Sequence, residues 1–289
     1  MFGVTVDPHN LAGSPDPAAL RDLGLSWVRM VALPSLEPYI ARCRNAGLRV
    51  LLVIARESVA VASVASYAAR YRPDAWAVGN EPDLVSPSSW SMTAEQYSLL
   101  WREALPLLRR QGVPIVTAGL ASGQPGWIEP IVGQLHGCHA VAVHPYAKTA
   151  EEARSLIREY RRVTRLPVWA TEWNRPAGEI AGFVAMLRQE AEVACWFCAT
   201  NGMVPGFGLL DVPEKLTAMK EAIMNVNIPE LDGIQDRVEL LEKQQALTVA
   251  VLKLILQGRW SGDLPNAEAV LKAINPNDTD WQAVPFVRG

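Results

Sequence analysis

Two glutamates, Glu81 and Glu172, each end a short apolar run in the sequence. The first lies in Gly-Asn-Glu-Pro-Asp at 79–83, and the second lies in Thr-Glu-Trp-Asn at 171–174. Two carboxyl groups that flank a sugar can cleave a glycosidic bond, because one protonates the leaving oxygen while the other, ionised, attacks the anomeric carbon. Enzymes that retain the anomeric configuration hold these groups roughly 5–5.5 Å apart. The residue types therefore predict glycoside cleavage if the fold brings the two segments together.

Further polar and aromatic residues lie in or just after other apolar runs. A cation such as Arg29 and a hydroxyl such as that of Tyr146 would keep a nearby Glu172 ionised, because both stabilise negative charge. Tryptophan rings have large flat apolar faces on which a sugar could stack. For each residue a structural role, such as a core histidine, a rim ion pair or a loop contact, stays an alternative. The predicted substrate-binding residues are Asp7, Arg29, Asn80, His144, Tyr146, Trp173 and Trp196.

Eight short runs rich in Val, Ile and Trp recur along the chain, with helix-like stretches between them. Near-continuous apolar character is typical of parallel strands covered on both faces. The units are about 27 residues long, close to the roughly 30 of a (β/α)8 barrel, whose active site lies at the carboxyl ends of the strands. We therefore predict an α/β fold, a (β/α)8 TIM barrel, with the two glutamates on its fourth and seventh strands. The predicted strands cover residues 2–7, 27–33, 49–55, 75–80, 114–120, 140–144, 167–172 and 194–200.

Helix signals lie between these runs. Thr93 and Gln96 have the spacing of a capping box, with Thr93 as N-cap and Gln96 three residues later. Glycine and proline mark several helix ends and strand starts. The predicted helices cover residues 16–24, 36–47, 93–110, 150–164, 179–191 and 216–224.

The sequence changes character near Asn225. We predict two domains, a catalytic barrel over 1–224 and a helical C-terminal extension over 225–289. From Leu231 onward the extension follows the 3-4 spacing of heptads, which is typical of a coiled coil, and the polar Gln245 and Thr248 could fix the register of a homo-oligomer. A helix that packs on the flank of the barrel is an equal alternative.

The Asn80-Glu81-Pro82 segment and Glu172 resemble clan A of the glycoside hydrolases, the "4/7" superfamily of retaining barrel enzymes that contains cellulases, mannanases and xylosidases. The resemblance covers roughly residues 1–224, whereas a helical tail is not typical of the clan. It implies cleavage of β-glycosidic bonds by double displacement, with Glu81 as acid/base and Glu172 as nucleophile. It also implies that Asn80 binds the sugar 2-hydroxyl.

The resemblance assigns further roles around these residues. Arg29, His144 and Tyr146 would support the nucleophile. A tryptophan of the eighth strand would floor the sugar subsite. The candidate is Trp196, and Phe197 or Phe207 are alternatives for the same place.

Composition narrows the function classes. The 289 residues are 49% hydrophobic and 20% charged, and the formal net charge is −3, which is typical of a globular protein. No basic stripe indicates a nucleic-acid partner, and a lightly acidic surface suits a neutral oligo- or polysaccharide. No leader and no apolar stretch of about 20 residues is visible. We therefore expect no membrane partner, and a protein that is cytoplasmic or released without a signal peptide.

Other functions are less favoured. A metal-dependent hydrolase needs clusters of histidine and carboxylate, but the chain has only four histidines. Gly206-Phe207-Gly208 lies where some barrels bind phosphate, but a lone Gly-x-Gly motif is weak evidence. We therefore expect no metal and no cofactor. A barrel that binds glycan without cutting it, or that serves as a structural component of a cell-surface or phage-borne particle, is the main alternative to an enzyme.

Overall fold

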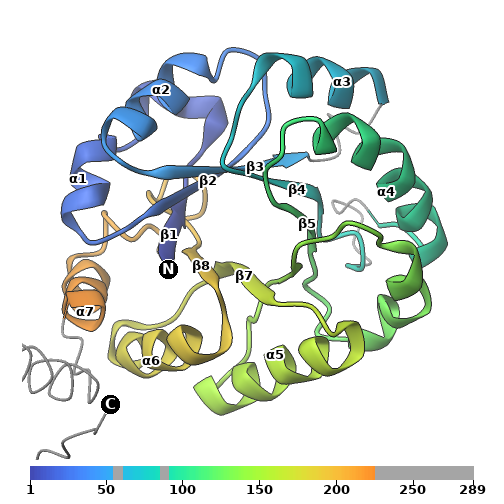
Figure 1. Ribbon diagram of the computed structural model, residues 1–289. Coiled ribbons are helices and arrows are strands. Elements are labelled where there is room, and N and C mark those ends of the chain that lie inside the picture. The colour runs from blue at the N-terminus through green and yellow to red at the C-terminus, as the bar shows by residue number, and fades with distance from the viewer. Residues whose placement is uncertain (55–60, 85–90, 225–289) are drawn as a thin grey trace, which may run out of the picture. The chain divides into compact units, whose positions relative to one another are not determined.

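The computed structural model describes residues 1–54, 61–84 and 91–224. Eight parallel strands lie at the centre of this part of the chain, and helices surround them (Figure 1). Each strand overlaps one of the eight predicted runs. The strands are β1 (Phe2–Thr5), β2 (Trp27–Val31), β3 (Arg49–Ile54), β4 (Ala75–Asn80), β5 (Ile115–Gly119), β6 (Val141–Val143), β7 (Val168–Trp173) and β8 (Val193–Trp196).

The strands form a nearly closed barrel. Their order is β5-β4-β3-β2-β1-β8-β7-β6, and every pair is parallel. The two ends of this order, β5 and β6, meet through the isolated parallel bridges Val116↔Ala140 and Leu120↔Val143. The predicted α/β fold, a (β/α)8 TIM barrel, is confirmed.

The helical layer matches the prediction with two differences. Helix α3 carries no strong start signal in the sequence and was not predicted, and between β5 and β6 the chain forms only short 3-10 helices. The latter segment contains Gly123, Pro125, Gly126 and Pro130, which disfavour a longer helix. The α-helices are α1 (Pro17–Asp22), α2 (Glu37–Asn45), α3 (Val61–Arg70), α4 (Ala94–Arg109), α5 (Ala150–Thr164), α6 (Ile180–Glu190) and α7 (Pro213–Met224), and the 3-10 helices include η1 (Pro8–Gly13), η3 (Pro125–Trp127), η4 (Glu129–Gln134) and η5 (Ala177–Glu179).

Capping residues explain where two of the helices begin. Thr93 accepts a hydrogen bond from the backbone of Gln96, and the Gln96 side chain accepts one from the backbone of Thr93, so the predicted capping box of α4 is confirmed. Thr149 and Glu152 form the same arrangement at the start of α5. Each box satisfies two backbone donors that the first helical turn leaves without partners.

Buried side chains form two separate clusters, because successive residues of a strand point to opposite faces. One cluster joins the strands to the helices. The other consists of residues from the strands and their ends and fills the inside of the barrel. There the rings of Trp27 and Trp169 meet edge to face, with their centroids 5.3 Å apart. The inner cluster contains Trp27, Leu51, Val53, Ala75, Ala77, Val116, Ala140, Ala142, Trp169, Val193 and Cys195.

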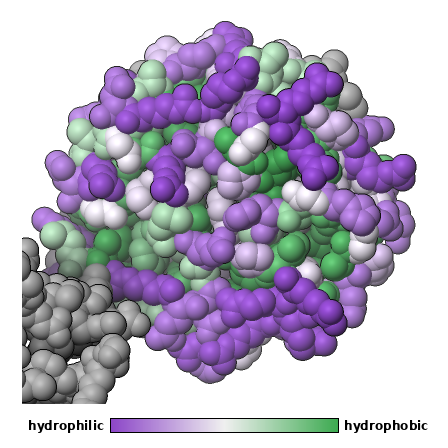
Figure 2. All heavy atoms as spheres, in the orientation of Figure 1, coloured by the Kyte–Doolittle hydropathy of each residue, from purple (hydrophilic) through white to green (hydrophobic). Residues whose placement is uncertain are grey.

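The outer surface is mostly hydrophilic over the helices, as the space-filling view shows around α5 (Figure 2). Among the described residues, no helix combines the length and apolar character that a membrane crossing requires. Residues Met1–Asn225 form one compact unit. The predicted extension over 225–289, with its coiled-coil and homo-oligomer interpretation, lies outside the described residues.

The inner cluster gives a stability prediction. Trp169 is 3% exposed, so Trp169→Ala should leave a cavity inside the barrel and lower the free energy of unfolding by about 3–5 kcal/mol. Urea denaturation followed by circular dichroism measures this change. Leu99→Ala is the matched control, because Leu99 is 54% exposed and its loss should change the free energy by less than about 0.5 kcal/mol. Equal stability of the two variants would contradict the packing described above.

Candidate active site

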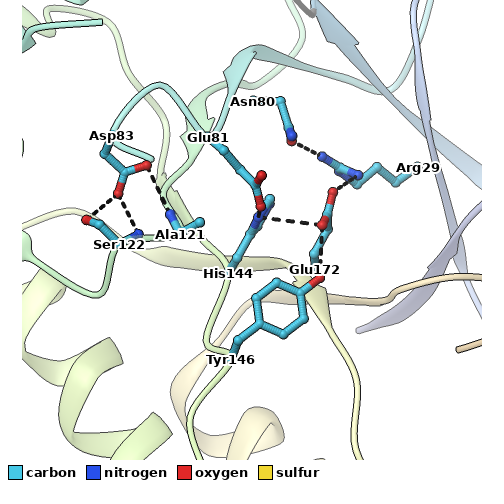
Figure 3. Close-up of polar contacts among 9 residues, drawn as sticks. All are labelled: Arg29, Asn80, Glu81, Asp83, Ala121, Ser122, His144, Tyr146 and Glu172. Atoms are coloured by element: carbon cyan, nitrogen blue, oxygen red, sulfur yellow. Dashed lines mark hydrogen bonds and ion pairs between the residues drawn. The ribbon is translucent and has the colours of Figure 1, made fainter. Parts of the chain in front are cut away.

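Glu81 and Glu172 meet at the carboxyl ends of the strands, as predicted for the fourth and seventh of them. Glu172 lies near the end of β7, and Glu81 directly follows β4. One carboxylate oxygen of each glutamate and one ring nitrogen of His144 all lie within 4.8 Å of one another. Figure 3 shows both carboxyl groups next to the same end of the His144 ring.

Backbone irregularities aim both carboxyl groups into the site. In β7 the pairing with β8 shifts register between Ala170 and Trp173, and such a bulge changes which face a side chain occupies. At the end of β4, Gly79 has φ 98° and Glu81 has φ 49°. A left-handed conformation is uncommon for a residue with a side chain, and such conformations cluster at functional sites.

Arg29 is the cation closest to Glu172. Its Nη1 lies 2.6 Å from Oε1 of Glu172, and only 4% and 8% of the two side chains are exposed. Its Nη2 donates to Oδ1 of Asn80 at 2.5 Å. Burial alone would raise the pKa of Glu172, but Arg29, followed by His144 and the Tyr146 hydroxyl, outweighs burial and holds that pKa below its ordinary value. The arrangement therefore keeps Glu172 ionised.

Tyr146 follows β6 and binds the second oxygen of Glu172. Its hydroxyl donates to Oε2 at 3.0 Å, although 43% of the residue is exposed. Burial of the hydroxyl end, together with the charge of Glu172, raises the pKa of Tyr146 far above its ordinary value. The hydroxyl therefore stays protonated and remains a donor.

His144 lies between the two glutamates and is fully buried. Its Nδ1 lies 2.8 Å from Oε1 of Glu81 and 3.6 Å from Oε2 of Glu172. On the other side, the ring packs so closely on Gly119 that a Cβ atom there would overlap it. The absence of a side chain at Gly119 therefore leaves room for the imidazole ring. The close packing of the ring on Gly119 fixes the position of Nδ1 relative to both carboxyl groups.

Two of the predicted substrate-binding residues, Trp173 and Trp196, lie in the core and not at the mouth. Trp173 and Trp196 are fully buried and pack on each other between the strands and the helices, with ring centroids 4.8 Å apart. Neither ring therefore has a face open to a sugar. Asp7 follows β1 at the carboxyl end of the strands, and its carboxylate accepts a hydrogen bond from the backbone of His9 at 2.9 Å.

Aromatic rings that keep exposed surface lie near the end of β8 instead. Phe197 follows Trp196 and is half-buried, while Phe207 is 38% exposed. The two rings make an edge-to-face contact, with centroids 6.2 Å apart. Strand alternation explains the difference, because Val193 and Cys195 face the barrel interior and Trp196 faces the helices.

Asp83 lies in the same segment as Glu81, but its place in the sequence predicts no role for it. The structure buries this residue, with 7% exposed, and its carboxylate accepts hydrogen bonds from the segment after β5. The Asn-Glu-Pro-Asp sequence offered one signal, an acid close to the proposed acid/base. Its partners could not be read from the sequence, because they lie almost 40 residues later.

The same side chains have the spacing of a cation site, because Glu81, His144 and Glu172 could each offer one ligand atom. Arg29 already places a positive charge 2.6 Å from Glu172. A divalent cation would therefore have to share the Glu172 carboxylate with a guanidinium. The arrangement suits two carboxyl groups that act directly on a substrate, one of them charged and held in place.

Solved structures with a similar fold include two glucanases and a binding protein. A GH128 subgroup II endo-β-1,3-glucanase from Sorangium cellulosum has a TM-score of 0.60 and 15% identity, covering 76% of this chain and 98% of its own. A GH128 subgroup VII oligosaccharide-binding protein from Cryptococcus neoformans has a TM-score of 0.58 and 16% identity, covering 78% and 94%. A GH5-4 broad specificity endoglucanase from Clostridium longisporum has a TM-score of 0.57 and 14% identity, covering 75% and 89%. At such identities the likeness establishes the fold.

Comparison with protein families gives a sequence match, whereas comparison with curated proteins gives none. Residues 60–204 match the family described as glycosyl hydrolase catalytic core. This stretch is about half of the chain, and it contains both Glu81 and Glu172. The chain therefore belongs to the glycosyl hydrolase catalytic core family, as its resemblance to glycoside hydrolases predicted.

Proposed function

We propose that this chain is a retaining glycoside hydrolase that cleaves β-glycosidic bonds of an oligo- or polysaccharide. Glu172 is the nucleophile and Glu81 the acid/base. One observation carries the proposal: oxygens of the two carboxyl groups lie within 4.8 Å of each other. This suits the roughly 5–5.5 Å of retaining enzymes better than the roughly 6.5–9.5 Å of inverting enzymes, which need room for a water molecule.

The reaction takes two displacements. In the first, an oxygen of Glu172 bonds to the anomeric carbon, the bond to the leaving oxygen breaks, and Glu81 gives its proton to that oxygen. In the second, the Glu81 carboxylate takes a proton from water, whose oxygen attacks the same carbon and releases Glu172. Glu81 is thus an acid in one step and a base in the next.

Neighbouring residues support these roles. Arg29 and Tyr146 hold one oxygen of Glu172 each, so the nucleophile is ionised and oriented before substrate arrives. Asn80 turns its amide oxygen toward Arg29. Its N–H donors then serve the sugar hydroxyl next to the reacting carbon.

The substrate class is inferred from structurally similar proteins. The Sorangium protein is an endo-β-1,3-glucanase and the Clostridium protein is an endoglucanase. We infer that a β-linked glucan is the substrate class to test first. The half-buried Phe197 and the partly exposed Tyr146 offer apolar surface for its sugar rings.

Removal of either carboxyl group should abolish most turnover. Glu172→Ala should lower kcat by about 10⁴-fold or more, because no covalent intermediate can form. Glu81→Ala should lower kcat/KM by about 10²–10⁴-fold on poor leaving groups, the usual contribution of general acid catalysis. Reducing-sugar release from β-1,3- and β-1,4-glucan, and aryl β-glycoside cleavage, measure both losses.

The control for these variants is Glu151→Ala on α5, because 71% of that glutamate side chain is exposed. It should keep wild-type turnover. A wild-type protein that binds these glycans and cleaves none of them would contradict the proposal and favour the non-catalytic glycan-binding alternative.

The lowered pKa of Glu172 predicts the acid limb of the pH profile. Because that pKa lies below its ordinary value of 4.5, the nucleophile stays ionised below pH 4.5 and the acid limb of kcat/KM should fall there too. Arg29→Met removes the charge that opposes burial, so its limb should move to higher pH. Arg29→Lys keeps a positive charge, so the acid limb of this variant should stay at the low pH of the wild type even if its turnover falls. Identical limbs in wild type and Arg29→Met would contradict this assignment.

A further inference from the structure

Asp83 is a buried carboxylate that joins the segment after β4 to the segment after β5. Its Oδ1 accepts from the backbone N–H of Ala121 at 3.1 Å. Its Oδ2 accepts from the backbone N–H of Ser122 at 2.8 Å and from the Ser122 hydroxyl at 2.6 Å. Figure 3 shows these bonds on the opposite side of Glu81 from Glu172. None of these atoms belongs to the catalytic pair, so the reaction proposed above leaves Asp83 without a role.

Asp83 lies two residues after Glu81, the proposed acid/base. Glu81 has a left-handed backbone, and its N–H donates to the carbonyl of Gly119 at 2.9 Å. Pro82 lies between the two acids, and its ring fixes its own φ. The Asp83 bonds and the Glu81–Gly119 bond therefore fasten both ends of a short, stiff segment to the end of β5.

The same end of β5 also sets the place of His144. Gly119 supports the back of the imidazole ring, and the N–H of His144 donates to the carbonyl of Leu120 at 2.8 Å. Residues 119–122 thus contact both the segment that carries Glu81 and its partner His144. Loss of the Asp83 bonds would free Glu81 to move relative to His144 and to the leaving oxygen.

We propose that Asp83 is a positioning residue for Glu81, which it holds within reach of the leaving oxygen through its bonds to Ala121 and Ser122. This inference rests on the function proposed above. If Asp83 only stabilised the fold, its loss would affect folding and would lower the turnover of every substrate alike. A positioning residue affects proton transfer, so the loss depends on how much help the leaving group needs.

Leaving-group dependence separates the two roles. The substrates are aryl β-glucosides, one with 2,4-dinitrophenol and one with phenol as leaving group. Dinitrophenolate leaves without a proton, whereas phenolate gains from general acid catalysis. In Asp83→Ala, the ratio of kcat/KM for the phenyl to the dinitrophenyl substrate should fall about tenfold or more, a part of the full effect of a general acid.

Two variants that remove fewer hydrogen bonds keep the test valid if Asp83→Ala does not fold. Asp83→Asn keeps an amide oxygen that can accept one backbone N–H, so its ratio should fall less. Ser122→Ala removes only the hydroxyl donor and should have the smallest effect. This order should hold among the variants that fold by circular dichroism.

Glu190→Ala is the matched control. Glu190 is also buried, with 5% of its side chain exposed, and it accepts from Arg158 at 2.9 Å and Arg161 at 3.0 Å. It ends α6 just before β8 begins, so it lies at the opposite end of the barrel from the glutamates. Its loss should lower the stability of the protein, while the ratio of kcat/KM for the phenyl to the dinitrophenyl substrate stays within about twofold of wild type.

The possible outcomes separate this inference from the proposed function. A wild type that cleaves neither of these substrates and neither β-1,3- nor β-1,4-glucan overturns the proposed function and this inference with it. A wild type that cleaves both aryl glucosides, with the same ratio in every Asp83 variant that folds, overturns the role of Asp83 alone. A selective loss on the phenyl substrate in Asp83→Asn, absent from Glu190→Ala, supports it.

Discussion

The buried ion pair between Arg29 and Glu172 is the constraint on which the site depends. A charged carboxylate in a protein interior is strongly disfavoured unless it is paired and hydrogen-bonded. Here Arg29 comes from β2, Glu172 from β7 and Tyr146 from the segment after β6. Because these partners are far apart in the sequence, only the assembled barrel can satisfy the charge. The fold and the ionised state of Glu172 therefore depend on each other.

Local departures from regular strand geometry give the two glutamates different surroundings. The register shift in β7 brings Glu172 against Arg29, with 8% of its side chain exposed. The left-handed turn after β4 brings Glu81 against His144, with 24% of its side chain exposed. A cation and a hydroxyl thus serve the more buried carboxyl group, while the more open one faces the mouth. This asymmetry suits one group that stays charged and one that exchanges protons.

Much of the barrel could be predicted, because apolar runs and helix caps are local features. Runs at a regular spacing located all eight strands, and the Thr93 capping box located the start of α4. The helix α3 and the short 3-10 helices after β5 were missed, because their sequences carry weak or conflicting local signals. The meeting of Glu81 and Glu172 could also be predicted, because the carboxyl ends of all the strands of such a barrel lie at the same mouth.

The missed residues depend on register and on distant partners. The resemblance to clan A places a tryptophan of the eighth strand at the mouth, but the alternation of β8 turns Trp196 toward the helices. Phe197, the next residue, has more exposed surface. Trp173 was misplaced because a bulge cannot be read from alternation alone. Asp83 had no visible role because its partners lie on another strand end.

The most direct measurement is the configuration of the first product, followed by proton NMR from the first minutes of hydrolysis of a β-glucan that the enzyme cleaves. Carboxyl oxygens of Glu81 and Glu172 lie within 4.8 Å of each other, which is less than the roughly 6.5–9.5 Å of enzymes that place a water molecule between the sugar and the second carboxylate. We expect the β-anomer to appear first and the α-anomer to follow only by mutarotation. Initial release of the α-anomer would show a single displacement by water, and it would contradict a nucleophilic Glu172.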